Sequence, residues 1–280
     1  MGKVLYMECS SGISGDMSVG MLLDLGADRG VLCEAIASLP VEGAEVYISE
    51  VDKKGIRAVD FDVRLDEDID NHDHDMDYLH GHNDHHHDHD HEGHDHHEGH
   101  DHHDHHHVHR TLSEVYEIID GGELTDNAAS IAKRIFETLG EAEAHAHETT
   151  IDKVHFHEVG AVDSIIDIVS IAVCLDNLDI TEIIVPAVAE GEGNIRTQHG
   201  ILDIPVPAVK YLLETYGIAI KPLHIKGEHV TPTGAAFVAA MRTDSVLPAS
   251  YEIIKSGVGA GKREYESEGV LKGHLIKLTD

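Results

Sequence analysis

Apolar and polar positions follow two different periods along this chain, and these periods predict both helices and strands. Apolar residues recur at helical spacing between Met17 and Leu25, and Gly26 stops that pattern. Short apolar runs bounded by turn residues are typical of strands. The elements predicted before residue 66 are strands over 3–9, 45–51 and 58–65, the helix that ends at Gly26, and a helix over 28–38.

The same two periods continue beyond residue 110. They predict helices over 111–119, 124–147, 161–178, 206–216 and 233–242, an extended segment over 154–158, and strands over 183–188, 218–225, 250–255 and 270–278. Helices and strands are mixed throughout. This order indicates an α/β or α+β fold, in which a mixed sheet is covered by packed helices.

A polar segment separates these two parts of the chain. Residues 72–109 hold 19 of the 27 histidines, and residues 65–109 hold 15 acidic residues and no Lys or Arg. Because the segment has almost no apolar surface to bury, we expect a disordered insertion over 66–109. The expected organisation is therefore an N-terminal strand–helix–hairpin part over 1–65, the insertion, and an α/β part over 110–280.

The charge and cysteine content exclude several classes of protein. The chain has 53 acidic residues against 20 Lys and Arg, a net charge of −33, which excludes charge-driven binding to nucleic acid or to anionic membranes. Its three cysteines show no C-x-x-C spacing, so they form neither a disulfide framework nor a thiolate zinc site. No apolar run approaches the roughly 20 residues of a membrane span, and we expect a cytoplasmic protein.

The His-rich segment is the first candidate metal site. Imidazole is largely neutral near pH 7 and suits Ni, Cu, Zn and Co, and at roughly four ligands per ion the segment could hold about four or five ions. The alternative is a solvated, pH-responsive spacer. The candidate ligands come from its densest runs: His85, His86, His87, His105, His106 and His107.

A second candidate metal site combines two histidines with carboxylates. In an extended segment, His155 and His157 share a face while Phe156 points to the core. Asp163 and Asp167 are four residues apart and line up on the following helix. Two imidazoles and carboxylates at a strand–helix junction suit a divalent metal, and the candidate ligands are His155, His157, Glu158 and Asp163.

An ordinary structural role remains the alternative for this second site. Asp163 would then cap or solvate the start of its helix, and one histidine would be a satisfied core residue. His145 and His147 end the preceding helix and cannot both face one ligand, so His147 is the better additional candidate.

Three loops suit an anion such as a phosphate. The turn over 10–16 joins a strand to a helix but lacks the Lys of a P-loop, and the segment 231–236 opens a helix whose free N–H groups favour an anion. A third loop over 191–200 carries one cation and one candidate base, His199. The alternative for each helix start is an ordinary N-cap. The candidate binding residues are Ser11, Ser14, Asp16, Arg196, Thr231, Thr233 and Gly234.

These segments together resemble the nickel insertion protein family of the lactate racemase system. The matching motifs are SGISGDM at 11–17, HFHEVGAVDS at 155–164, TQHG at 197–200 followed by IPVPA at 204–208, and TPTGAA at 231–236. They occur in the family's order and cover nearly the whole chain outside the His-rich segment. The His-rich insertion before the helix at 111 is also similar to insertions that occur in that family.

The resemblance implies insertion of Ni(II) into pyridinium-3,5-bisthiocarboxylic acid mononucleotide, which forms the nickel-pincer nucleotide with a direct Ni–C bond. It further implies CTP with Mn(II) or Mg(II), a nucleotide substrate and an acceptor enzyme. The family's full-length proteins continue past the region 257–261 into a C-terminal lobe that carries the CTP site. We expect that lobe to be a separate polypeptide, unless this protein works differently or only stores and delivers nickel.

The residue chemistry suggests a role for each candidate. The His-rich segment would be a nickel reservoir, the HFHE motif with Asp163 the transfer site, the Ser and Thr turns the phosphate anchors, and His199 the base that removes the ring proton. Two other functions stay open. They are a non-catalytic nickel store or chaperone, and an unrelated metal-dependent hydrolase or nucleotide enzyme.

Overall fold

The computed structural model describes residues 2–65, 110–154, 156, 162–197 and 200–279. The His-rich segment with all its candidate ligands lies outside these residues, as do His155, His157, Glu158 and His199. The described helices are α1 (Gly15–Asp24), α2 (Arg29–Ser38), α4 (Leu112–Gly121), α5 (Asp126–Ala146), α6 (Val162–Asn177), α7 (Pro207–Thr215) and α8 (Pro232–Met241). The strands are β1 (Lys3–Glu8), β2 (Ala44–Lys53), β3 (Ile56–Leu65), β4 (Ile180–Ile184), β5 (Val188–Glu192), β6 (Asn194–Thr197), β7 (Gly200–Asp203), β8 (Ile220–Lys226), β9 (Tyr251–Ala260) and β10 (Val270–Leu278).

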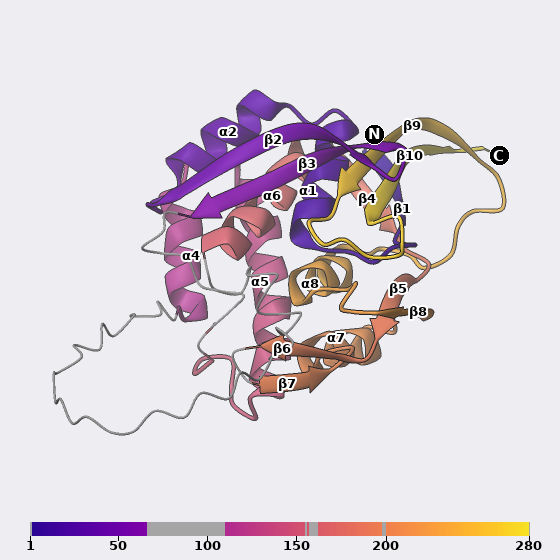
Figure 1. Ribbon diagram of the computed structural model, residues 1–280. Helices are drawn as coiled ribbons and strands as arrows, with labels where there is room; N and C mark the ends of the chain where they lie inside the picture. The colour runs from indigo at the N-terminus through magenta and orange to yellow at the C-terminus, as the bar shows by residue number, and fades with distance from the viewer. Residues whose placement is uncertain (1, 66–109, 155, 157–161, 198–199, 280) are drawn as a thin grey trace, which may run out of the picture.

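The main sheet is mixed, as predicted. Its strand order is β2-β3-β9-β10-β1-β4, in which β1 runs antiparallel to β10 and parallel to β4. Strands that precede the His-rich segment in sequence and strands that follow it are therefore interleaved in one sheet (Figure 1). The predicted division of the chain into a part before residue 66 and a part after residue 109 stays a prediction. In the structure, strands from both parts belong to the same sheet.

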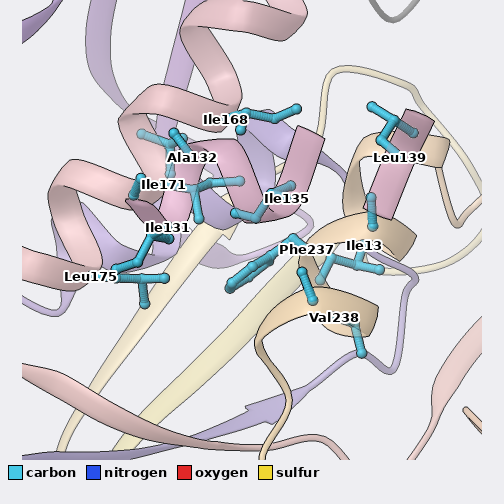
Figure 2. Close-up of a cluster of buried hydrophobic side chains, with 14 of the residues drawn as sticks. Ile13, Ile131, Ala132, Ile135, Leu139, Ile168, Ile171, Leu175, Phe237 and Val238 are labelled. Carbon is cyan, nitrogen blue, oxygen red and sulfur yellow. The ribbon is translucent and has the colours of Figure 1, made fainter. Parts of the chain in front are cut away.

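Helices cover this sheet and build the core. Helix α1 packs on β3, β9 and β10, and α6 packs between α1 and α5 (Figure 1). Figure 2 shows side chains of α5, α6 and α8 meeting, with Ile13 from the turn after β1 among them. Ile13, Ile135 and Phe237 are completely buried there. Phe156 is also completely buried, which confirms its predicted place in the core.

The most apolar helices are buried within the fold. Eleven residues of α6 between positions 162 and 175 are buried. In α8, every residue from 233 to 240 is buried. Within the described part of the chain, each helix falls short of the length and apolar character that crossing a membrane requires. The apolar sequences of these helices therefore reflect packing against their neighbours.

Three predicted boundaries were wrong. The strand predicted over 183–188 is two strands, β4 and β5, because Pro186 cannot donate a ladder hydrogen bond and the chain crosses there to pair with β8. The predicted loop over 191–200 contains β6, which pairs antiparallel with β7. Strand β9 continues five residues past the predicted end at 255, where its glycines lie against α1.

Candidate functional site at the start of helix α1

Two turns that the sequence analysis treated separately lie against each other. The N–H of Ile13 donates to the carbonyl of His229 (2.8 Å), and the N–H of Thr231 donates to the carbonyl of Ile13 (3.1 Å). Gly12 has a φ of +95°, and a Cβ there would lie 2.0 Å from the His229 oxygen. A Cβ at Gly234 would lie 2.4 Å from the Ile13 oxygen. Glycine is required at both positions because the two backbones touch.

The hydroxyl groups of these turns make local contacts. Thr231 caps α8 by accepting a hydrogen bond from the N–H of Gly234 (3.2 Å), so the N-cap interpretation holds for this residue. Ser14 precedes α1 and donates its hydroxyl hydrogen bond to the carboxylate of Asp16. Two further hydroxyls belong to buried residues, Ser11 and Thr233, each 6% exposed.

Carboxylates from two helices meet at the start of α1. The N–H of Asp16 donates to the carboxylate of Asp167 on α6, which thereby caps α1 from a neighbouring helix. Gly15 permits this approach, because a Cβ there would lie 2.3 Å from Asp167 Oδ2. Asp163 stands one turn before Asp167 on the same helix and interacts electrostatically with it. The structure thus brings together Asp16 and Asp163, which the sequence analysis had assigned to separate sites.

This group of three carboxylates, Asp16, Asp163 and Asp167, carries excess negative charge. Burial raises the pKa of Asp167 well above its ordinary value, and the charges of Asp16 and Asp163 raise it further. Burial also raises the pKa of Asp16, against hydrogen bonds from Ser14 and the Met17 N–H. The nearby cation of Lys262 opposes both shifts. Such a site favours a bound proton or a metal cation.

The described candidates Arg196, His145 and His147 lie in or next to other elements. Arg196 is exposed on β6. His147 ends α5, where its Nε2 lies 3.6 Å from Glu143 Oε2, and His145 stacks on Tyr211 with ring centroids 4.4 Å apart. Among the described residues, no three His, Cys, Asp or Glu side chains are arranged to hold a metal ion. A metal bound near α1 would need further ligands from beyond them.

Sequence reasoning left two important residues out of its candidate list. Asp167 lies one helical turn after Asp163, and this spacing was the available evidence for it. Glu190 on β5 is one of two acidic residues, with Glu192, in a stretch of small residues, and no spacing or motif distinguished it. Its carboxylate is nevertheless buried, with only 2% of the residue exposed, beside the loop that contacts Ile13.

Comparison with known proteins shows which sequences this chain is similar to. The chain is 47% identical over 278 residues to the pyridinium-3,5-bisthiocarboxylic acid mononucleotide nickel insertion protein of Alkaliphilus metalliredigens, which covers 99% of this chain and 61% of that protein. The proteins of the same name from Acetivibrio thermocellus and Geobacillus kaustophilus are each 36% identical and cover 94% of the chain, and 57% and 56% of their own lengths. No solved structure matches the chain.

The chain therefore spans about three fifths of the length of these relatives. The family model described as nickel insertion protein matches residues 5–278, on both sides of the His-rich segment and through every described element. Two of the motif segments that carried the resemblance, 11–17 and 162–164, lie at the group of three carboxylates. The chain belongs to the nickel insertion protein family.

Proposed function

We propose that this chain takes part in inserting nickel into pyridinium-3,5-bisthiocarboxylic acid mononucleotide, the substrate in the names of its relatives. The observation that carries the proposal is the meeting of Asp16 and Asp163 around Asp167 at the start of α1. Asp16 and Asp163 each belong to a motif segment of the family. Together with Asp167 they create a site that attracts a cation. Nickel, as the cation to be transferred, fits this charge.

Nickel transfer would use ligands of intermediate softness beside the carboxylates. His155, His157 and Glu158 precede α6 in sequence, and with Asp163 they offer the imidazole and carboxylate ligands that favour Ni(II) over Mg(II). The mononucleotide phosphate would lie near the turns of Ser11 and Thr231. Because carboxylates repel a phosphate, the two can share this region only with a cation or a proton between them.

Formation of the Ni–C bond requires a proton to leave the ring carbon. As the C–H bond breaks, its electron pair becomes the Ni–C bond, so a base must take the proton. His199 is the proposed base, because an imidazole titrates near neutral pH. Arg196, three residues earlier on β6, is proposed to bind an anionic group of the substrate, with Ser14, Thr233 and Gly234 completing the contacts.

Other parts of the system are proposed from the family resemblance. The His-rich segment, including His85–His87 and His105–His107, would supply nickel. CTP with Mn(II) or Mg(II) would act through a C-terminal lobe. We place the reaction in the cytoplasm and expect an acceptor enzyme to receive the finished nucleotide.

The test is a reconstituted nickel-insertion reaction. The chain is mixed with the mononucleotide, NiCl₂, CTP and MnCl₂, with and without a polypeptide made from the part of the Alkaliphilus relative that this chain does not match. Mass spectrometry then detects the nickel-containing nucleotide. We expect product with the wild type and a large loss with Asp163→Ala. Equal product with the variant would contradict the proposed site.

Nickel storage is a second candidate function, favoured by one observation. Nineteen histidines within residues 72–109 exceed what a single transferred ion needs. If the chain binds several nickel ions but gives no product with every component of the reconstituted reaction present, storage and delivery become the better interpretation.

A further inference from the structure

Glu190 forms the centre of a second buried cluster beside the turn that holds Ile13. Its Oε1 accepts hydrogen bonds from the N–H groups of Gly191 (2.8 Å), His229 (2.8 Å) and Val230 (3.3 Å). Its Oε2 is buried and has no hydrogen-bond partner among the described residues. A buried carboxylate with one saturated and one unpartnered oxygen costs free energy, so its retention needs a reason.

The three donors show what this carboxylate connects. Gly191 belongs to β5, whereas His229 and Val230 belong to the loop before α8, and the carbonyl of His229 in turn binds the N–H of Ile13 (2.8 Å). A Cβ at Gly191 would lie 2.7 Å from His229 Nδ1, so strand and loop are in close contact. One side chain therefore links β5 to the contact between the two turns of the candidate site.

The charged groups around Glu190 come from two loops. Glu228 lies next to His229 and forms an ion pair with Arg263 (3.0 Å), which belongs to the loop between β9 and β10. Tyr265, from that same loop, stacks on His229 with ring centroids 4.1 Å apart and donates its hydroxyl hydrogen bond to the Glu228 carbonyl (2.8 Å). The cation of Arg263 is thus paired with Glu228, and the Glu190 carboxylate relies on backbone N–H groups.

Glu190 is the residue of this cluster that takes up a proton near neutral pH. The pKa of Glu190 is raised to about 7, mainly by burial and also by the charge of Glu228, against the hydrogen bonds from the backbone N–H groups. Burial lowers the pKa of His229, whose Nδ1 lies 3.0 Å from the Gly227 carbonyl and therefore donates to it as part of a neutral ring. Near neutral pH, the group that changes charge here is the carboxyl of Glu190.

We propose that Glu190 is a positioning residue that clamps the loop 228–231 to β5 and thereby holds the Ile13 turn against the start of α8. The proposal rests on the proposed function in one respect: the two turns it aligns are those assigned to the nucleotide. The backbone N–H groups favour the carboxylate, but burial outweighs them, so the closed arrangement prefers the neutral carboxyl. The clamp should therefore loosen as the pH rises through neutrality, because opening the loop returns the ionised group to water.

Hydrogen–deuterium exchange of the full chain, followed by mass spectrometry, measures this clamp directly. The variants are Glu190→Ala, which removes the acceptor, Glu190→Gln, which keeps an acceptor oxygen but no charge, and Glu192→Ala as a control on the same strand. Glu192 is exposed, and its carboxylate lies 3.4 Å from the exposed imidazole of His224. Protection is read in peptides that cover 11–15, 189–193 and 227–232, at pH 5 and pH 8.

We expect Glu190→Ala to lose about tenfold or more of the protection in all three peptides, with α5 and α6 unchanged, as the loss of a charge-assisted hydrogen bond predicts. In the wild type, protection corrected for intrinsic exchange should fall from pH 5 to pH 8. Glu190→Gln should keep protection at the level of the wild type at pH 5 and show no fall. Glu192→Ala should match the wild type.

The proposal is overturned if Glu190→Ala leaves the peptide covering 11–15 as protected as in the wild type, or if Glu190→Gln keeps the fall with pH. An Ala variant that exchanges rapidly everywhere has unfolded, and the Gln variant then decides by its pH profile. Because the measurement uses neither nickel nor a nucleotide, its failure is distinguishable from failure of the reconstituted reaction.

Discussion

Buried carboxylates are the residues that distinguish this protein at the smallest scale. Asp167 on α6 accepts a hydrogen bond from the N–H of Asp16 at the start of α1, and the charge of Asp16 adds to the burial that raises the pKa of Asp167. The sequence could predict that Asp163 and Asp167 share a helix face, because that depends on spacing alone. It could not predict that Asp167 reaches Asp16, because the approach depends on how α1 packs against α6.

The first prediction concerns Asp167→Asn. Because the pKa of Asp167 is raised in the folded state, the folded protein binds a proton that the unfolded chain releases, and wild-type stability falls as the pH rises above about 4. The variant cannot ionise there, so its free energy of unfolding relative to the wild type should increase from pH 5 to pH 8, by about 1 kcal/mol or more. Urea denaturation at both pH values measures this difference.

A matched control is Glu117→Gln on the exposed face of α4. Its stability relative to the wild type should not change between the two pH values. If Asp167→Asn behaves like this control, the carboxyl of Asp167 does not hold the proton that its burial implies.

Glu190 gives a second prediction with a defined pH window. Its pKa of about 7 in the folded state exceeds the ordinary value of 4.5, so it destabilises the fold progressively from about pH 4.5 to pH 7. The stability of Glu190→Gln relative to the wild type should therefore rise across this window, by up to about 3 kcal/mol. Thermal unfolding at pH 5 and pH 8 tests it, and a constant difference would contradict the raised pKa.

At the scale of elements, local patterns predicted most helices, whereas the partners of the strands needed the structure. The helix predicted over 161–178 is α6, because its apolar residues and its length are unambiguous. Strand β1 pairs with β10, from the far end of the chain, and no local pattern specifies such a partner. Strand β6 escaped prediction because its four residues are partly exposed.

Gly234 supplies a third prediction, at the contact between α8 and the turn after β1. Replacing a helical glycine by alanine ordinarily stabilises by up to about 1 kcal/mol. At this position the new Cβ would lie 2.4 Å from the backbone oxygen of Ile13, so we expect Gly234→Ala to destabilise by about 2 kcal/mol or more. Chemical denaturation measures the change.

Gly30, in the first turn of α2, is the matched control for Gly234. The nearest atom to a Cβ at Gly30 is the side-chain oxygen of Asp28, 3.1 Å away, and this side chain can move. Gly30→Ala should therefore be neutral or slightly stabilising. Equal effects of the two substitutions would show that the turns are not in tight contact.

At the scale of the whole molecule, the described residues on both sides of the His-rich segment pair and pack with one another. Strand β3, which ends at Leu65, pairs with β2 and β9, and Arg110 pairs with the buried Phe156 on the other side of the segment. The sequence predicted this separation from composition alone, because a segment with so few apolar residues has little to contribute to a core. The position of its histidines relative to Asp163 has no such compositional rule.

A fourth prediction follows from that separation. Replacing 66–109 by a Gly–Ser linker of about 20 residues should leave a single cooperative unfolding transition, because the pairs and core contacts of the described residues are kept. Bound nickel, measured by plasma mass spectrometry, should fall by several ions. Loss of cooperative unfolding would show that the segment contributes to the fold.

The pH dependence of nickel binding tests the whole arrangement at once. Imidazole binds metal only when neutral, so nickel affinity should fall steeply below about pH 6. Ligands in the His-rich segment must be ordered by the ion, whereas a site beside α6 would have part of its geometry supplied by the fold and should hold nickel to lower pH. The full chain should therefore lose nickel in two phases, and the linker variant in the more acidic phase alone. A single phase that disappears with the segment would leave no compact nickel site near Asp163, and storage would then be the function that remains.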